Sequence, residues 1–319
     1  MGPGRRGGGK GPSGRRSRME IGIVGLGRMG GGMAARLAKG GHRVVGFART
    51  PAAVAAAVAD GAVGASSLSD LVQKLARPRT VWLMVPAGEP TEQYVGELVG
   101  LLSSGDTLVD GGNSNFRDSL RHAARAKAAG VDFLDVGVSG GVWGRTEGYC
   151  LMIGGDAAAC ERLAPLFRSL APSPTEGWGR VGDSGSGHYV KMVHNGIEYG
   201  LMEAYAEGFD ILRAQPAWKL DLGQVATIWR RGSVVRSWLL DLTADILASS
   251  AELEQIAPYV RDSGEGRWTV EESIALDVPA PVIMMALERR LRSRQADPFA
   301  ERLLAAMRQR FGGHAVGTG

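Results

Sequence analysis

The chain has 319 residues, of which 44% are hydrophobic and 22% are charged, a composition typical of a globular protein with room for two domains. Its formal net charge of +4 comes from residues 1–18, which hold six of the 37 basic residues and no acid. The rest of the chain carries 31 basic and 33 acidic residues. This balance excludes a domain that binds nucleic acid through a large excess of positive charge.

Residues 1–18 contain seven glycines and a single apolar side chain, too little to repay the entropy of ordering. We expect a disordered basic leader, or residues translated upstream of a start at Met19. The leader lacks the apolar run of a secretory signal, and no stretch of about 18 apolar residues suggests a membrane span. Because Cys150 and Cys160 form no zinc or disulfide pattern, we expect a cytoplasmic protein without a metal site.

The first predicted element is a strand at Glu20–Val24, followed by a glycine-rich turn and by residues 31–39 with helical character. The turn fits the pattern G-x-G-x-x-G with Gly25, Gly27 and Gly30. Such glycines let backbone N–H groups approach a pyrophosphate at the helix N-terminus. Together with a second strand at Arg43–Phe47, the turn predicts a dinucleotide-binding domain.

The end of this second strand bears on the choice of cofactor. NAD sites usually place Asp or Glu there for the ribose 2′-hydroxyl, whereas Arg accommodates the 2′-phosphate of NADP. The chain has Arg49 and no acid, which favours NADP and leaves NAD open. The alternative is that Thr50 and Pro51 simply start a helix and that Arg49 is a solvated flank.

Three further strands are predicted at Thr80–Val85, Thr107–Asp110 and Phe133–Val138, each followed by glycines and a small polar side chain. Ligands bind at the carboxyl ends of strands in an open α/β sheet, so we expect a polar crevice there. Asp183–Gly187 has the composition of a linker.

From His188 onward the hydrophobic pattern is helical. The predicted helices span residues 188–213, 221–231, 235–248, 250–262, 269–276, 280–294 and 298–310. The expected fold is an α/β Rossmann-like dinucleotide-binding domain over residues 19–185, followed by an all-α domain over residues 186–319.

One predicted helix carries an unusual polar face. Lys191, Asn195 and Glu198 fall at i, i+4 and i+7 and therefore share one side. His194 lies beside them, and apolar residues occupy the opposite side. A base, hydrogen-bond donors and an acid on one face suit proton-transfer chemistry, although a solvated face is the plain alternative.

From Met19 to its end, the chain resembles the decarboxylating 6-phosphogluconate dehydrogenases in their shorter bacterial form. The matching segments are Gly25–Gly30, Asp110–Ser114, Val138–Gly141, Lys191–Gly200, Gly264–Trp268 and Phe311–His314. The resemblance implies an enzyme of the pentose phosphate pathway that converts 6-phosphogluconate to ribulose 5-phosphate and CO₂ while reducing NADP or NAD. It also implies a homodimer or higher homo-oligomer, with the helical domain serving substrate binding and dimerisation.

The resemblance further implies the roles of individual residues. Lys191 takes the proton of the substrate 3-hydroxyl, and burial would favour its neutral form. After CO₂ is lost, Lys191 stabilises the enolate oxygen and Glu198 protonates C1 of the enediol. The implied substrate contacts are Asn113, Ser139, Gly140, Gly141, His194, Asn195, Tyr199, Ser263, Arg290, Arg308 and His314. The implied cofactor contacts are Gly25, Leu26, Gly27, Arg28, Met29, Gly30, Arg49, Thr50, Val85, Pro86, Ala87 and Asn113.

Within these contacts, Tyr199 and Arg290 match groups that hold the 6-phosphate, with Arg289 as the alternative to Arg290. Arg308 and His314 match a C-terminal tail that reaches into the partner subunit's site. Three positions depart from the longer enzymes, which have Asn, Lys and Lys where this chain has Ala48, Pro86 and Ser263. These departures leave the phosphate contacts and the cofactor preference open.

The nearest alternative is a β-hydroxyacid dehydrogenase of the 3-hydroxyisobutyrate type, which acts without decarboxylation. Such enzymes share a glycine, lysine and asparagine pattern that is matched by Gly185, Gly187, Lys191 and Asn195. They need no proton donor for an enediol, so Glu198 favours decarboxylation. A non-catalytic dinucleotide sensor or nucleic-acid binder using the leader is a further alternative, disfavoured by the intact Lys191 and Glu198.

Overall fold

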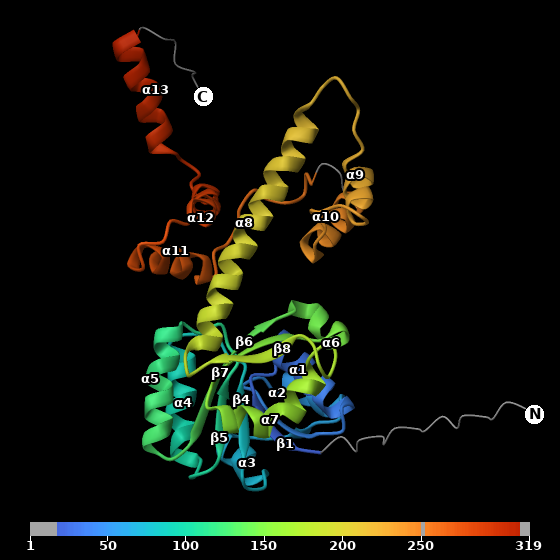
Figure 1. Cartoon of the computed structure of the whole chain (residues 1–319), viewed down its shortest axis with the longest axis vertical. Helices are drawn as coiled ribbons and strands as arrows, with labels where there is room; N and C mark the ends of the chain where they lie inside the picture. The colour runs from blue at the N-terminus through green and yellow to red at the C-terminus, as the bar shows by residue number, and fades with distance from the viewer. Residues whose placement is uncertain (1–17, 250–252, 313–319) are drawn as a thin grey trace, which may run out of the picture. The chain divides into compact units, whose positions relative to one another are not determined.

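The computed structural model describes residues 18–249 and 253–312 and divides the chain into two compact units, Met1–Met192 and Val193–Gly319 (Figure 1). The division falls inside helix α8 (Ser186–Ala214). Residues 1–17 of the predicted leader and His314 lie outside the described residues.

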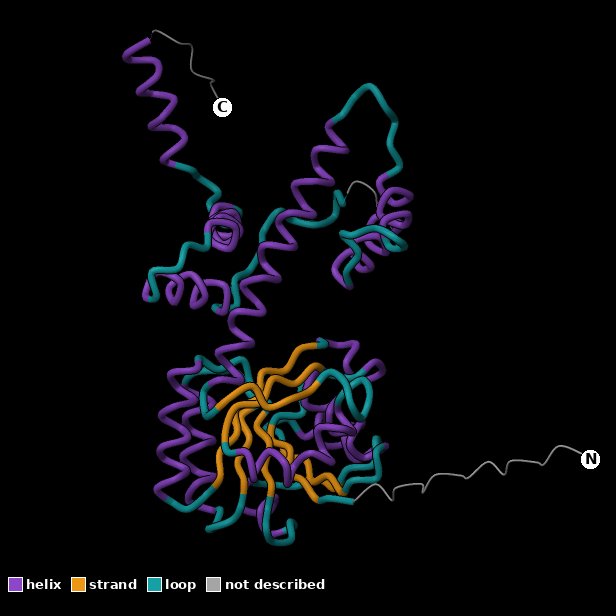
Figure 2. Tube along the Cα trace, viewed as in Figure 1, coloured by secondary structure: helices purple, strands orange, loops and turns teal. Residues whose placement is uncertain are grey.

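The first unit is built on one eight-stranded sheet with the order β3-β2-β1-β4-β5-β6-β7-β8 (Figures 1 and 2). The strands are β1 (Glu20–Val24), β2 (Arg43–Phe47), β3 (Val63–Gly64), β4 (Thr80–Leu83), β5 (Thr107–Asp110), β6 (Asp132–Ser139), β7 (Cys150–Gly155) and β8 (Trp178–Gly182). Strands from β3 to β6 are parallel, whereas β7 runs antiparallel to β6. The strand order reverses between β1 and β4, the switch point at which such sheets bind dinucleotides.

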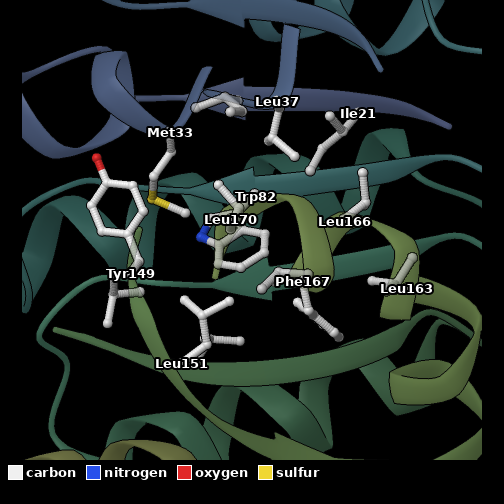
Figure 3. Close-up of a cluster of buried hydrophobic side chains, with 14 of the residues drawn as sticks. Ile21, Met33, Leu37, Trp82, Tyr149, Leu151, Leu163, Leu166, Phe167 and Leu170 are labelled. Carbon is white, nitrogen blue, oxygen red and sulfur yellow. The ribbon is translucent and has the colours of Figure 1, made fainter. Parts of the chain in front are cut away.

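Helices cover both faces of this sheet because alternate strand residues are apolar on both sides. The connecting helices are α1 (Arg28–Lys39), α2 (Pro51–Ala59), α3 (Leu68–Gln73), α4 (Glu89–Leu101), α5 (Phe116–Ala128), η1 (Gly141–Trp143), α6 (Gly144–Glu147) and α7 (Ala157–Leu170). Val109 of β5 packs in a core with α1 and α7, part of which Figure 3 shows. Its neighbour Leu108 packs in a second core with α3, α4 and α5.

The second unit is helical. After α8 come α9 (Leu222–Trp229), α10 (Trp238–Ser249), α11 (Glu265–Ala275), α12 (Pro281–Arg292) and α13 (Phe299–Gly312). One small core joins the later part of α8 to α9 and α10 around Phe209 and Leu240. Another joins α8 to α11 and α12 around Tyr199 and Leu287. A Rossmann-like domain followed by a helical one is therefore confirmed.

Two local predictions differ from the structure. Residues 253–263 form turns and bends instead of the predicted helix over 250–262, of which 250–252 lie outside the described residues. Leu253 has φ of 53°, and Pro258 has no N–H to donate, so both oppose a helix here. The predicted linker Asp183–Gly187 is a bend and turn over residues 183–185, and its last two residues belong to α8, which begins at Ser186.

Three strands were not predicted, namely β3, β7 and β8. Strand β7 is a short apolar run that ends in glycines, and such a run cannot be told from a buried helix by periodicity. No helix in the described part of the chain combines the length and the apolarity that a membrane span requires.

Candidate active site

The glycine turn between β1 and α1 has the geometry of a pyrophosphate cradle. Gly25 has φ of 94°, and a Cβ there would lie 2.4 Å from the Met84 carbonyl oxygen. A Cβ at Gly30 would lie 1.9 Å from the Gly25 carbonyl oxygen, so both positions require glycine. A Cβ at Gly27, the N-cap of α1, would meet nothing within 4 Å. The backbone is therefore closely packed at Gly25 and Gly30, whereas the space beside Gly27 at the N-terminus of α1 is open. A dinucleotide phosphate fits this open space.

The other residues predicted to contact the cofactor surround the same end of the sheet. Leu26 is 6% exposed and belongs to the core, so only its backbone is available. Arg28, Arg49 and Thr50 are exposed. Thr50 is the N-cap of α2, but its side chain makes no capping hydrogen bond. Val85, Pro86 and Ala87 follow β4, the strand paired with β1.

Asn113 lies on a loop that a buried carboxylate holds in place. Asp110, at the end of β5, is fully buried. Its Oδ1 accepts a hydrogen bond from the Gly112 N–H at 3.0 Å, and its Oδ2 accepts one from the Ser114 hydroxyl at 2.7 Å. With its two neighbours fixed in this way, Asn113 is presented to solvent.

Ser139, Gly140 and Gly141 follow at the end of β6. The two glycines have φ of 130° and 53°, which lie in the region that favours glycine. Ser139 pairs with Cys150 across the β6–β7 ladder. Desolvation by the surrounding protein raises the pKa of the Cys150 thiol.

A second buried carboxylate fixes the first turn of α8 on the sheet. The Asp135 side chain in β6 accepts hydrogen bonds from the Gly185 N–H at 2.6 Å and the His188 N–H at 2.9 Å. A Cβ at Gly187 would lie 2.3 Å from the Asp135 carbonyl oxygen, so the helix can approach only through glycine. His188 also bonds through Nδ1 to the Ser119 hydroxyl on α5 at 2.6 Å.

Lys191 lies one turn further along this anchored helix. It is 6% exposed, which is rare for lysine. A Cβ at Gly137 of β6 would lie 2.3 Å from the Lys191 Cβ, so glycine in the strand permits this close packing. The structure therefore places the predicted base in a buried position against the sheet.

The remaining residues of the polar face continue along α8 in the second unit. Asn195 is 9% exposed, and its Oδ1 lies 2.9 Å from the His194 Nδ1. Glu198 is half-buried. At the 1.5 Å rise per residue of an α-helix, seven residues separate Lys191 from Glu198 by about 10 Å along the axis.

Tyr199, Ser263 and Arg290 come together within the second unit. The Arg290 guanidinium carbon lies 3.5 Å from the centre of the buried Tyr199 ring. The Tyr199 hydroxyl lies 3.4 Å from the Ser263 Oγ. Arg289 instead pairs with Glu203 at 3.1 Å, so Arg290 is the arginine that contacts this cluster.

Arg308 is not brought to this cluster by any contact among the described residues. It lies on α13, whose described side chains from Phe299 to Arg310 are all exposed.

Four buried or half-buried acids support these residues and were not predicted as site residues from the sequence: Asp110, Asp135, Asp262 and Glu265. Asp135 carried a signal, because it interrupts an apolar strand. Asp262 carried none, since it stands between Arg261 and Ser263 in a polar segment. Residues 18–249 and 253–312 contain no group of three or more His, Cys, Asp or Glu that could hold a metal ion.

Both units match known families. A family model described as the NAD binding domain of 6-phosphogluconate dehydrogenase matches residues 20–179. A second, described as the C-terminal domain of 6-phosphogluconate dehydrogenase, matches residues 187–307. The chain belongs to the 6-phosphogluconate dehydrogenase family. It is accordingly an oxidoreductase whose first unit is an NAD(P)-binding domain.

Individual relatives agree with this membership of the 6-phosphogluconate dehydrogenase family. The chain is 44% identical over 299 residues to a protein of Haloferax volcanii named "6-phosphogluconate dehydrogenase, NAD(+)-dependent, decarboxylating", covering 93% of this chain and 98% of that one. The solved 6-phosphogluconate dehydrogenase of Plasmodium falciparum is similar with a TM-score of 0.80 and 26% identity, over 94% of this chain and 66% of that one.

The alternative enzyme class shares the fold. A 3-hydroxyisobutyrate dehydrogenase from Salmonella typhimurium is similar with a TM-score of 0.71 and 24% identity, over 85% of this chain and 92% of that one. At this identity the likeness concerns architecture alone.

Proposed function

We propose that this chain oxidises 6-phosphogluconate to ribulose 5-phosphate and CO₂ while reducing NADP or NAD. The observation that carries the proposal is the buried Lys191, which shares one helix with the acid Glu198 and is anchored on the NAD(P)-binding unit. The family membership supports the same reaction.

The first step needs a base at the substrate 3-hydroxyl. Lys191, in its neutral form, takes the hydroxyl proton as the C3–H bond breaks. The bound nicotinamide supplies the acceptor for the hydride. In support of this role, Lys191 is buried against β6.

The second and third steps move protons without a further cofactor. The 3-keto acid loses CO₂, and the electron pair of the broken C1–C2 bond forms an enediol whose oxygen takes the proton back from Lys191. Glu198 then delivers a proton to C2, which becomes C1 of ribulose 5-phosphate, while the hydroxyl proton returns to Lys191. Glu198 is half-buried on the same helix, which suits a group that donates to a bound intermediate.

The remaining contacts would orient the substrate. Asn113, Ser139, Gly140, Gly141, His194 and Asn195 offer backbone and side-chain donors for the carboxylate and hydroxyl groups. Tyr199, Ser263 and Arg290 form one cluster in the second unit and would hold the 6-phosphate.

For the cofactor, we infer a preference for NADP over NAD, with use of both. Support comes from Arg49, which is exposed at the end of β2 where an NAD site usually has an acid. The printed names of relatives differ, since the Haloferax protein is named NAD(+)-dependent and the Plasmodium structure includes NADP+. Arg49 is therefore the basis of this preference.

We also infer a homodimer in which Arg308 and His314 of one copy complete the site of the other. The exposure of α13 supports this, because Phe299, Leu304 and Met307 are 72%, 57% and 46% exposed on one helix. We further expect the enzyme to work in the reducing cytosol, since Cys150 and Cys160 are both free thiols.

The decisive experiment follows NAD(P)H absorbance with 6-phosphogluconate and either cofactor while released CO₂ is trapped. We expect reduced cofactor and CO₂ in equal amounts. Reduction without CO₂ would contradict the role of Glu198. Activity on unphosphorylated 3-hydroxy acids, with none on 6-phosphogluconate, would establish the 3-hydroxyisobutyrate type of reaction in its place.

A further inference from the structure

A cluster of arginines surrounds one carboxylate in the second unit. The Asp262 side chain is 5% exposed and lies on the loop that precedes α11, where it contacts Tyr199 of α8, Arg267 of α11 and Arg294 beyond the end of α12. Its Oδ2 accepts a hydrogen bond from Arg267 Nη2 at 2.9 Å and lies 3.7 Å from Arg294 Nη2. Its Oδ1 accepts bonds from the Gly264 N–H at 2.9 Å and the Tyr199 hydroxyl at 3.4 Å.

The same carboxylate therefore links Arg267 to the Tyr199 and Arg290 cluster. Arg290 lies over the Tyr199 ring at 3.5 Å and also donates to the Arg261 carbonyl oxygen at 3.0 Å. This bond ties Arg290 to the loop that carries Asp262.

The charges around this loop favour an anion. The side chains of Arg267, Arg290 and Arg294 contact this loop or the Tyr199 ring beside it, and the loop and the start of α11 carry two acids, Asp262 and Glu265, so positive charge is in excess. The Nη2 atom of Arg294 is buried and has no hydrogen-bond partner. A phosphate monoester, with two negative charges and several acceptor oxygens, suits such a cluster.

Arg267 is fixed by a hydrogen bond and is also accessible to a ligand from solvent. Its Nη2 is fixed by Asp262, yet 43% of its side chain is exposed, which leaves other guanidinium donors open to a ligand. Ser263 has no positive charge to offer, so Arg267, which lies in the first turn of α11 and is bonded to Asp262 beside Ser263, can supply the cationic contact at this end of the substrate.

We propose that Arg267 is a further substrate-binding residue that contacts the phosphate of a phosphorylated sugar acid, with Asp262 as its positioning residue. This rests on the proposed function for the identity of the substrate. The anion site itself is a property of the second unit and can be tested without turnover.

The test uses the full-length chain, with inorganic phosphate as the probe in a ³¹P NMR titration at low ionic strength. Arg267→Gln should raise the Kd for phosphate about tenfold, as expected for the loss of a charged hydrogen bond. Arg213→Gln is the matched control, because Arg213 is 56% exposed in an ion pair with Asp210 of the same unit. Its Kd should change less than about twofold.

Turnover provides a second readout. Arg267→Gln should raise the KM for 6-phosphogluconate and leave kcat nearly unchanged, because the contact is remote from the reacting carbons. Equal effects of Arg267→Gln and Arg213→Gln on phosphate binding would overturn the proposal.

Two further outcomes are distinguishable. If Arg267→Gln does not fold, Arg267→Lys takes its place, because lysine keeps a positive charge beside Asp262 but lacks the planar guanidinium. We expect Arg267→Lys to weaken phosphate binding several-fold. If the wild type binds phosphate through Arg267 but does not turn over 6-phosphogluconate, the proposed function fails and the anion site stands.

Discussion

Lys191 and Glu198 serve different steps of the proposed reaction, so their substitutions should separate those steps. Lys191→Met removes the base, and NAD(P)H formation should fall at least about a hundredfold. The control is Lys219→Met, which removes an exposed lysine of the second unit and should leave the rate unchanged. Stopped-flow absorbance measures the rate of NAD(P)H formation. An unchanged rate in Lys191→Met would show that Lys191 is not the base.

For Glu198→Gln we expect NAD(P)H and CO₂ to form in the first turnover, with slow release of ribulose 5-phosphate. The amide cannot donate the proton that the enediol requires, whereas hydride transfer does not involve it. Glu207→Gln, at an exposed position of α8, is the matched control. Rapid-quench product analysis measures the rate at which ribulose 5-phosphate forms. Formation at the wild-type rate in Glu198→Gln would contradict the role of Glu198 as the proton donor.

Arg49 bears on cofactor choice. Arg49→Glu replaces a cation with a group that repels a 2′-phosphate and can accept from a 2′-hydroxyl. The ratio of kcat/KM for NADP to that for NAD should therefore fall at least about tenfold. Lys127→Glu makes the same charge change at an exposed position on α5 and should leave the ratio as it is. A ratio that stays constant in Arg49→Glu would mean that Arg49 is only a solvated flank.

At the scale of elements, α8 depends on glycine where it meets the sheet. In Gly187→Ala the new Cβ would lie 2.3 Å from the Asp135 carbonyl oxygen and 2.6 Å from that of Met152. The helix must shift away, and the free energy of unfolding should fall by about 1–3 kcal/mol. Because Lys191 follows one turn later, kcat should fall as well.

Gly179→Ala in β8 is the control for this substitution, since its Cβ would meet nothing within 4 Å. Urea unfolding of the two variants gives the comparison. Equal stabilities would show that α8 tolerates a side chain at this contact.

The loop before α11 is held by Asp262, and its contribution to stability depends on pH. Burial raises the pKa of Asp262, but the hydrogen bond from Gly264 and the pairing with Arg267 outweigh this, so its pKa lies below the ordinary 3.8. A lowered folded-state pKa stabilises the fold above the unfolded value, and this stabilisation is lost as pH falls through the folded value.

Asp262→Asn should consequently cost about 1–3 kcal/mol at neutral pH and much less at low pH. Urea unfolding over a pH series measures the difference from wild type. Asp210→Asn, in an exposed pair with Arg213, should show little cost at any pH. A pH-independent cost for Asp262→Asn would contradict the ionic role of this carboxylate.

At the scale of the whole molecule, the proposed dimer predicts complementation. Lys191→Met and Arg308→Ala should each be inactive or nearly so. When they are mixed and allowed to exchange subunits, a hybrid dimer would combine intact Lys191 from one copy with intact Arg308 from the other. Because exchange is statistical, we expect activity of about a quarter of wild type. Steady-state assays that show no recovery, with exchange verified by native mass spectrometry, would place Arg308 in its own subunit's site or outside any site.

Much of the fold followed from local patterns in the sequence. The glycine turn after Glu20–Val24 identifies the dinucleotide-binding unit because it combines strand, turn and helix in a fixed order. The polar face of α8 was also local, since helical spacing alone groups Lys191, Asn195 and Glu198. The predicted helix over 250–262 is absent from the described part of that segment, because Pro258 has no N–H to donate and Leu253 has a positive φ, despite the helical apolar spacing.

Long-range contacts were decided only by the tertiary structure. The sequence by itself determined the order of the two units, the cofactor turn and the candidate base and acid, because each depends on residues a few positions apart. It could not reveal that Asp135 caps α8 from 50 residues away, or that Asp262 lies 63 residues from Tyr199 in the chain and bonds to it. Such pairings arise only when separate elements pack together, because a carboxylate that becomes buried must then find hydrogen-bond donors on the neighbouring elements.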